Sequence, residues 1–218
     1  MNESEFRDEI CRVGLSLYQR RYVHGAAGNI SVRLLHEGGY LITPTDACLG
    51  HLNAKSIAKV DLEGHQVSGD RASKSVALHR AIYAAEPTAQ CVIHTHSTHL
   101  VALTLSGVWN QEDIVPPITP YFVMKVGHVP LIPYHRPGDP KVGELIAQKI
   151  RQMQARHTPI RAVLLDRLGP NVWHQSLSQA SAVLEELEET ARLYLMAKST
   201  PLSEFQIQEL RDQFDAKW

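Results

Sequence analysis

The sequence has no excess of either charge and no hydrophobic run long enough to cross a membrane. Its 22 lysine and arginine residues nearly balance 23 aspartate and glutamate residues, so the formal net charge is −1. This balance creates no global field that attracts nucleic acid or acidic membranes. No apolar stretch approaches the ~20 residues of a transmembrane helix. The acidic start of the chain is unlike a signal peptide. We expect a cytoplasmic protein without a nucleic acid or membrane partner.

Cysteine is scarce, and the chain has neither an internal repeat nor a low-complexity linker. Cys11, Cys48 and Cys91 are odd in number and fit no metal or redox motif, and two of them have apolar surroundings, so buried free thiols are expected rather than disulfides. At 218 residues, with 44% hydrophobic residues, the chain is long enough to bury a core. Residues 1–218 are expected to form a single domain.

Helical and extended patterns alternate along the chain. Apolar residues at helical spacing predict helices over about 3–20, 75–85, 140–153, 177–197 and 204–214. Extended patterns predict strands near 30–34, 40–43, 56–68 (two strands), 91–94, 128–134, 161–165 and 171–173, with a turn at 169–170. Prolines make 115–120 a loop and indicate that 128–134 is an edge strand. The pattern predicts an α/β domain in which helices bracket a mixed central sheet.

The most informative motif is Cys91-Val92-Ile93-His94-Thr95-His96-Ser97. Alternate side chains of a strand share a face, so His94 and His96 would point the same way. The apolar residues before them indicate a buried strand, and Ser97 suits the N-cap of the helix that follows. The pair would lie at the carboxyl end of a strand, where open α/β sheets place ligands. This context favours a metal site over two ordinary surface histidines, which the spacing alone would also allow.

Several segments together resemble the class II aldolase and epimerase superfamily, to which the adducin head is related. The similar segments are Gly28–Ser31, Leu41–Thr45, Ser73–Ser75 with His79 four residues on, and Val92–Ser97. The resemblance implies a single-domain, three-layer αβα fold with a mixed, mainly antiparallel central sheet. Three further stretches are most similar to one branch, the 3-oxo-tetronate 4-phosphate decarboxylases: Pro117–Tyr121, Pro133–Asp139 and Leu184–Ala191.

The resemblance also implies roles for individual residues. His94 and His96 match two zinc ligands of the family. Tyr121 falls near a loop that in relatives faces an active site shared between subunits, so a homo-oligomer, commonly a tetramer, is expected. Amide, hydroxyl and ammonium groups donate hydrogen bonds to phosphate oxygens, although such residues are also common in turns and caps. Four such residues match positions around a substrate phosphate: Asn29, Thr45, Ser73 and Lys74.

Two positions depart from the family pattern. Relatives carry a catalytic Glu or Asp where this chain has Ser75, and a third zinc histidine where it has Leu168. A catalytic zinc normally has three protein ligands. His79 is the first candidate for the missing ligand because it lies one helical turn after Ser75 and so shares its face. It could instead be a buried residue that supports the site. The other candidates are His24, His99 and His128.

The departure at Ser75 bears on the reaction. Aldolases and epimerases depend on a placed acid or base, so its loss would be severe. Decarboxylation of a 3-oxo acid mainly needs a cation at the developing oxyanion and a proton for C2, from a water on the metal, Lys74 or Tyr121. We expect decarboxylation of a phosphorylated four-carbon 3-oxo sugar acid to dihydroxyacetone phosphate, with zinc or another divalent metal. The alternatives are an aldolase acting on another hydroxy-keto phosphate and a non-catalytic binding protein on the same fold. Loss of catalysis would explain why Ser75 and Leu168 replace the expected site residues.

Overall fold

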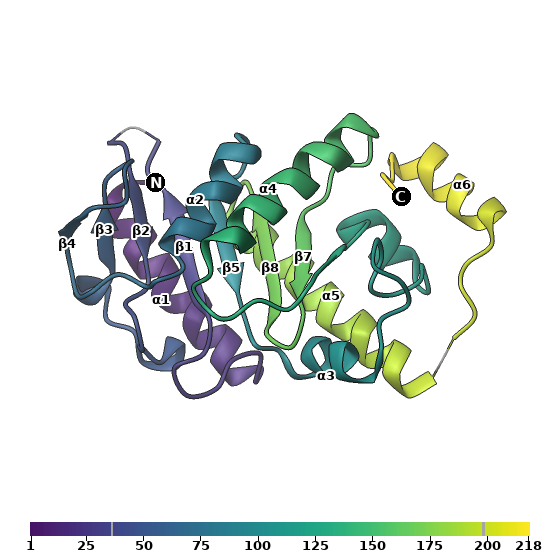
Figure 1. The fold of residues 1–218 in the computed structure, drawn as a ribbon, viewed down its shortest axis with the longest axis horizontal. Helices are drawn as coiled ribbons and strands as arrows, with labels where there is room; N and C mark the ends of the chain where they lie inside the picture. Colours follow the sequence, from purple (N-terminus) through teal and green to yellow (C-terminus); the bar gives the residue numbers. More distant parts are fainter. Residues whose placement is uncertain (36, 198) are drawn as a thin grey trace.

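In the computed structural model, which describes residues 1–35, 37–197 and 199–218, one eight-stranded sheet forms the centre of the molecule (Figure 1). The strand order is β4-β3-β2-β1-β5-β8-β7-β6. Neighbouring strands are antiparallel except β6 and β7, which are parallel. The strands are β1 (Asn29–Arg33), β2 (Tyr40–Ile42), β3 (Ala58–Val60), β4 (Gln66–Ser68), β5 (Cys91–His94), β6 (Leu131–Ile132), β7 (Ala162–Leu165) and β8 (Gly169–His174). The predicted mixed, mainly antiparallel sheet is confirmed.

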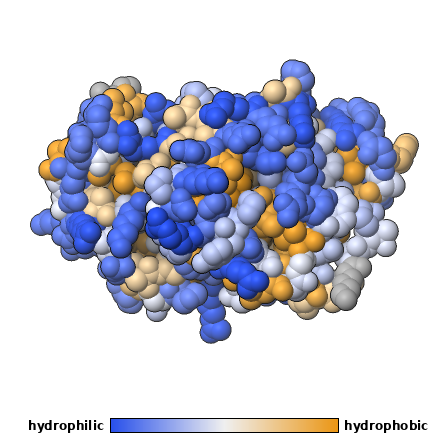
Figure 2. All heavy atoms as spheres, in the orientation of Figure 1, coloured by the Kyte–Doolittle hydropathy of each residue, from blue (hydrophilic) through white to orange (hydrophobic). Residues whose placement is uncertain are grey.

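Helices cover both faces of this sheet and complete the predicted three layers. On one face the core includes side chains of α1 (Glu3–Gln19), α3 (Thr98–Ser106) and α5 (Leu177–Ala197). On the other face the core includes side chains of α2 (Val76–Ala85) and α4 (Pro140–Ala155). The remaining helical segments are η1 (Leu49–His51), η2 (Ala54–Ser56), η3 (Phe122–Val126) and α6 (Glu204–Phe214). Figure 2 shows mostly hydrophilic residues on the visible face of the molecule, with smaller hydrophobic areas between them.

The alternation of β5 decides where the histidine pair lies. Ile93 is buried in the core under α1, α3 and α5, whereas Val92 is buried in the core under α2 and α4. His94 follows the same two-residue period as Val92, so its side chain belongs to the face that α2 and α4 cover. In the sheet its direct neighbours are Asn29 on β1 and Asn171 on β8. The end of β5 therefore brings one imidazole and two amides to the same face.

Three local predictions need correction, and one short element was not predicted. Gly169 and Pro170 are not a turn but the first residues of β8. A Cβ at Gly169 would lie 2.1 Å from the carbonyl oxygen of Thr95, so glycine allows β8 to start against the end of β5. Ser97 occupies the N-cap position of α3, but its hydroxyl bonds to that of Thr95 and does not cap the helix. The strand predicted over 128–134 is confined to β6, and the five-residue π-helix η3 was not predicted.

Two predictions from composition can be compared with the described residues. Cys11, Cys48 and Cys91 are free cysteines, as expected, but only Cys91 is buried, because Cys11 and Cys48 are partly exposed. None of the described helices combines the length and hydrophobicity that spanning a bilayer requires.

Candidate active site

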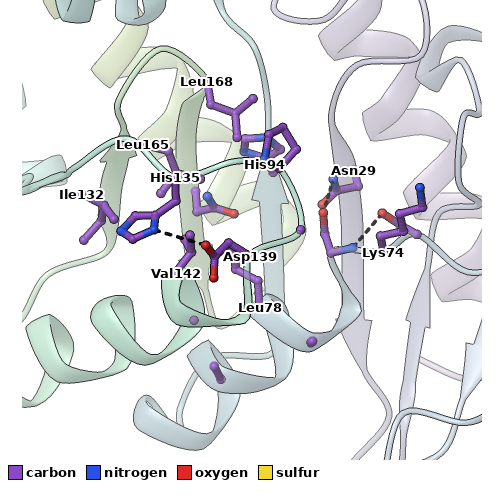
Figure 3. A pocket seen from close by; sticks show the side chains of 18 of the residues that line it. Asn29, Lys74, Leu78, His94, Ile132, His135, Asp139, Val142, Leu165 and Leu168 are labelled. Atoms are coloured by element: carbon purple, nitrogen blue, oxygen red, sulfur yellow. Dashed lines mark hydrogen bonds and ion pairs between the residues drawn. The ribbon is translucent and has the colours of Figure 1, made fainter.

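A cavity of about 680 Å³ opens beside the end of β5, on the face covered by α2 and α4 (Figure 3). A cavity of this size is typical of small-molecule sites. Its wall comes from β1, the loop after β2, the start of α2 and the end of β5, and it includes seven residues singled out in the sequence: Asn29, Thr45, Ser73, Lys74, Ser75, His94 and His96. Groups that lie up to 67 residues apart in the sequence thus meet in one place.

The rings of His94 and His96 lie edge to face at this cavity. Their centroids are 5.0 Å apart, with an angle of 68° between the planes. Two imidazoles that share a tetrahedral zinc at ordinary Zn–N distances have centroids roughly 5 Å apart. Nδ1 of His94 donates to the carbonyl oxygen of Pro170 at 2.8 Å, which leaves the lone pair of Nε2 for a metal. These two side chains therefore fit a shared metal ion.

Both rings are uncharged at neutral pH, which is the form that binds a metal. Burial, with a smaller contribution from His96, lowers the pKa of His94 to about 4, although the hydrogen bond to Pro170 partly opposes both effects. Burial also lowers the pKa of His96, and the nearby ring of His24 contributes in the same direction. A cation therefore has no bound proton to displace from either ring.

His79, the first candidate for a third ligand, does not line the cavity. Its side chain is buried, and its Nδ1 lies 2.7 Å from Oγ of Ser31, which in turn lies 2.7 Å from the hydroxyl of Tyr83. Burial lowers the pKa of His79 to about 3, with a smaller contribution from His94. The strand β1 therefore holds His79 beside the site. Its Nε2 is buried without a hydrogen-bond partner among the described residues, but the side chain does not line the cavity, which fits the alternative of a buried supporting residue.

The other candidate histidines differ in position. Nδ1 of His99 lies 2.9 Å from Glu188, and Nδ1 of His128 lies 2.8 Å from Asp113, with neither residue lining the cavity. The ring centroid of His24 is 6.4 Å from that of His96. Within residues 1–35, 37–197 and 199–218, no group of three or more His, Cys, Asp or Glu side chains is arranged to hold a metal. Two imidazoles are thus in place and a third protein ligand is not.

The start of α2 forms one side of the cavity. Nδ2 of Asn29 donates to Oγ of Ser75 at 3.1 Å, and the backbone N–H of Ser75 donates to Oγ of Ser73 at 3.3 Å. Lys74 is exposed between these two serines. A helix N-terminus carries partial positive charge, and the ammonium group adds a full one. This side of the cavity is therefore suited to an anion.

The opposite side is formed by elements for which the sequence gave no roles. His135 lies 3.5 Å from the carboxylate of Asp139 at the start of α4, and the neighbouring Arg136 also lines the cavity. Figure 3 shows His94 between this side and the side of Asn29 and Lys74. Five apolar side chains complete the wall: Leu78, Ile132, Val142, Leu165 and Leu168. The segment 133–139 had been noted only as a similarity to one branch of the family.

Asn171 is a second residue that the sequence did not single out. It is 1% exposed, lies next to His94 in the sheet, and lines the cavity. Its Nδ2 and the Oδ1 of Asn29 are buried without a hydrogen-bond partner. Buried amide atoms are rarely left unpaired, so a ligand is expected to satisfy them. The only sequence signal for Asn171 was its polar side chain within an otherwise apolar strand.

Tyr121 is not among the residues that line the cavity of its own chain. It immediately precedes η3, and its side chain is 62% exposed. Within its own chain, Tyr121 therefore does not contribute to this cavity.

Residues 8–195 match the family model of the class II aldolase and adducin N-terminal domain. The chain belongs to this family. It is 56% identical to a 3-oxo-tetronate 4-phosphate decarboxylase of Cupriavidus necator, with 99% of each chain covered. YgbL of Escherichia coli has a similar crystal structure, with a TM-score of 0.85, 41% identity, and 96% of this chain and 99% of that chain covered. An L-fuculose 1-phosphate aldolase has the same fold, with a TM-score of 0.79, 22% identity, and 99% and 98% covered.

Proposed function

We propose that this protein is a metal-dependent carboxy-lyase that converts a 3-oxo-tetronate 4-phosphate to dihydroxyacetone phosphate and carbon dioxide. The observation that carries the proposal is one cavity in which two neutral imidazoles lie beside a cationic helix start. The full-length similarity to a decarboxylase of that name supports the choice of substrate.

The two sides of the cavity suggest how such a substrate lies. The phosphate would bind at the start of α2, where Ser73 and Lys74 offer donors and Asn29 and Thr45 lie beside them. The carbon chain would then cross His94 and His96. The carboxylate would face the apolar wall that includes Leu165 and Leu168.

The chain's own residues would then act on the bond between the carboxyl carbon and C2. A divalent metal such as zinc, held by Nε2 of His94 and His96, would stabilise the charge that develops on the substrate oxygens. The apolar wall excludes water from the carboxylate, which favours its loss as carbon dioxide. The electrons of the broken bond between C1 and C2 would form a double bond between C2 and C3, with the charge on the 3-keto oxygen, and C2 must then receive a proton. Lys74 is our candidate donor from within the cavity, with Ser75 beside it.

Incubation of the purified protein with Zn²⁺ and each C2 enantiomer of the substrate tests this proposal. We expect one enantiomer to give carbon dioxide and dihydroxyacetone phosphate in equal amounts. An aldehyde product from another hydroxy-keto phosphate would favour an aldolase instead. The third possibility is a binding protein, which would explain why Ser75 and Leu168 replace the expected site residues. It predicts a folded protein that binds the phosphorylated acid and releases no product.

We further propose that the protein is a cytoplasmic homotetramer in which Tyr121 reaches the cavity of a neighbouring copy. Two tyrosines support such contacts because Tyr121 and Tyr134 are each 62% exposed. Light scattering gives the number of chains. Mixed oligomers of Tyr121→Phe and His94→Ala chains should be more active than either variant alone, since some sites then combine both intact residues. Activity no higher than that of the parent variants would contradict sharing of the site.

A further inference from the structure

We infer that His24 is the third protein ligand of the metal. Leu168, which stands where relatives carry the third histidine, has no donor atom and cannot take this role. This inference rests on the proposed function only in assuming that His94 and His96 hold a metal. His24 lies on the loop before β1, not on α2 or β8.

Three imidazole rings follow one another at the end of β5. The centroid of His94 is 5.0 Å from that of His96, and the centroid of His24 is 6.4 Å from His96 on an edge-to-face approach of 74°. A shared tetrahedral zinc requires a separation of roughly 5 Å, so the ring of His24 is about 1 Å too far away. His24 is exposed. A rotation of its side chain therefore closes the gap without a change in the core.

The backbone that carries His24 is held against the site. The N–H of Ala27 donates to the carbonyl oxygen of His24 at 3.0 Å, which closes a turn over Gly25. Gly28 has a φ of +82°, and a Cβ there would lie 2.8 Å both from the carbonyl oxygen of His94 and from Cγ1 of Val23. The loop thus passes directly over the backbone of His94. Its position is fixed while the ring of His24 remains free to turn.

The other side chains near the pair are less able to turn toward a shared metal. Leu168 lines the cavity and has no atom that binds a metal. His79 is buried with its Nδ1 held at Ser31, so its ring is fixed in place, although its Nε2 has no hydrogen-bond partner in the part of the chain that the structure describes. His135 does line the cavity, but Figure 3 shows its ring directed toward Asp139 on the far side from the start of α2. His24 does not line the cavity either, but its exposed ring already lies beside His96 and is free to turn toward it.

Zinc affinity tests the assignment without reference to catalysis. The wild-type protein, His24→Ala and His65→Ala would compete for Zn²⁺ with a chromophoric chelator. His65 is the matched control because its side chain is 80% exposed and belongs to the turn between β3 and β4. Loss of residues that merely orient ligands already weakens binding 10–100-fold, so His24→Ala should weaken it by about 100-fold or more. His65→Ala should bind as the wild type does.

Cobalt provides a second readout, because the visible absorption of Co²⁺ reports its coordination. His24→Ala should change the Co²⁺ spectrum, and adding Leu168→His to that variant should restore both the spectrum and the zinc affinity. Unchanged thermal unfolding of metal-free His24→Ala would show that the fold is intact. Zinc affinity of His24→Ala within about threefold of the wild type, with an unchanged Co²⁺ spectrum, would overturn the assignment.

The outcomes separate this assignment from the proposed function. If the wild type releases carbon dioxide but His24→Ala binds zinc as tightly as the wild type, His24 is not a ligand and the proposed decarboxylase function stands. Zinc binding that depends on His24, without release of carbon dioxide, would support the ligand and reject the decarboxylase. A wild-type protein that binds no zinc would overturn the ligand assignment.

Discussion

Asn29 joins the two halves of the site. Its side-chain Nδ2 donates to Oγ of Ser75 at the start of α2, 3.1 Å away, while its backbone is paired with His94 in the sheet. The side of the cavity suited to an anion is therefore attached directly to the strand that carries the first imidazole. A change at either partner is expected to alter both stability and substrate binding.

Ser75→Ala removes this hydrogen bond and leaves the amide of Asn29, which is 7% exposed, without its acceptor. We expect the free energy of unfolding to fall by about 1–2 kcal/mol, since a lost bond and an unpaired donor both contribute. Urea denaturation measures this change. Ser178→Ala, at an exposed position of α5, is the control and should stay within about 0.5 kcal/mol of the wild type. An equal effect of both substitutions would mean that the bond contributes nothing.

Lys74→Met should weaken binding of phosphorylated ligands. The ammonium group is exposed at the cavity, and a hydrogen bond to a charged group contributes roughly 1.5–3 kcal/mol. Inorganic phosphate should therefore bind about tenfold more weakly or worse, which calorimetry measures directly. Lys55→Met removes an exposed lysine that does not line the cavity, so phosphate affinity should not change. Equal affinities of the two variants would place the phosphate elsewhere.

Gly28→Ala should be more damaging than Gly25→Ala. Both glycines have positive φ, +82° and +54°, so alanine at either position is strained by roughly 1–2 kcal/mol. Only at Gly28 does the added Cβ also meet the carbonyl oxygen of His94, at 2.8 Å, whereas at Gly25 it meets nothing within 4 Å. We expect the unfolding free energy to fall further for Gly28→Ala, with a loss of zinc affinity. Similar zinc affinity in both variants would show that the loop does not position His94.

Acid should destabilise the metal-free protein through its buried histidines. Burial lowers the pKa of His79 to about 3 and that of His94 to about 4 in the folded state, whereas an unfolded histidine titrates near 6.5. The unfolded chain therefore binds more protons below pH 6.5. The stabilisation is complete above that pH and is lost as pH falls toward 4 and then 3. Urea denaturation from pH 7 to 4 should show this fall, with a smaller slope for His79→Gln. Identical slopes for the two proteins would exclude His79 as a source.

Local sequence patterns were sufficient to predict the histidine pair and the two departures from the family. The apolar residues of 91–93 predicted a buried strand, which β5 is, but not which face of the sheet His94 would lie on. The resemblance to the family grouped Asn29, Thr45 and Lys74 around one substrate phosphate. In the structure all three line the same cavity, although they come from three different parts of the chain.

Tertiary packing decided what the sequence did not. His79 does follow Ser75 by one helical turn, but β1 supplies the hydroxyl of Ser31 that holds its ring away from the cavity. Asn171 was missed because its importance comes from β8 pairing with β5, a contact between distant segments. The π-helix η3 escaped notice because five residues are too few to show a period.

The most direct test of the central claim is ¹³C NMR of 3-oxo-tetronate 4-phosphate labelled at C1, incubated with the zinc-loaded protein and with His94→Ala. The proposed function predicts that the label leaves as ¹³CO₂ and bicarbonate, that unlabelled dihydroxyacetone phosphate accumulates in equal amount, and that His94→Ala gives neither above background. Retention of the label in a sugar phosphate, or equal release by the wild type and His94→Ala, would contradict it.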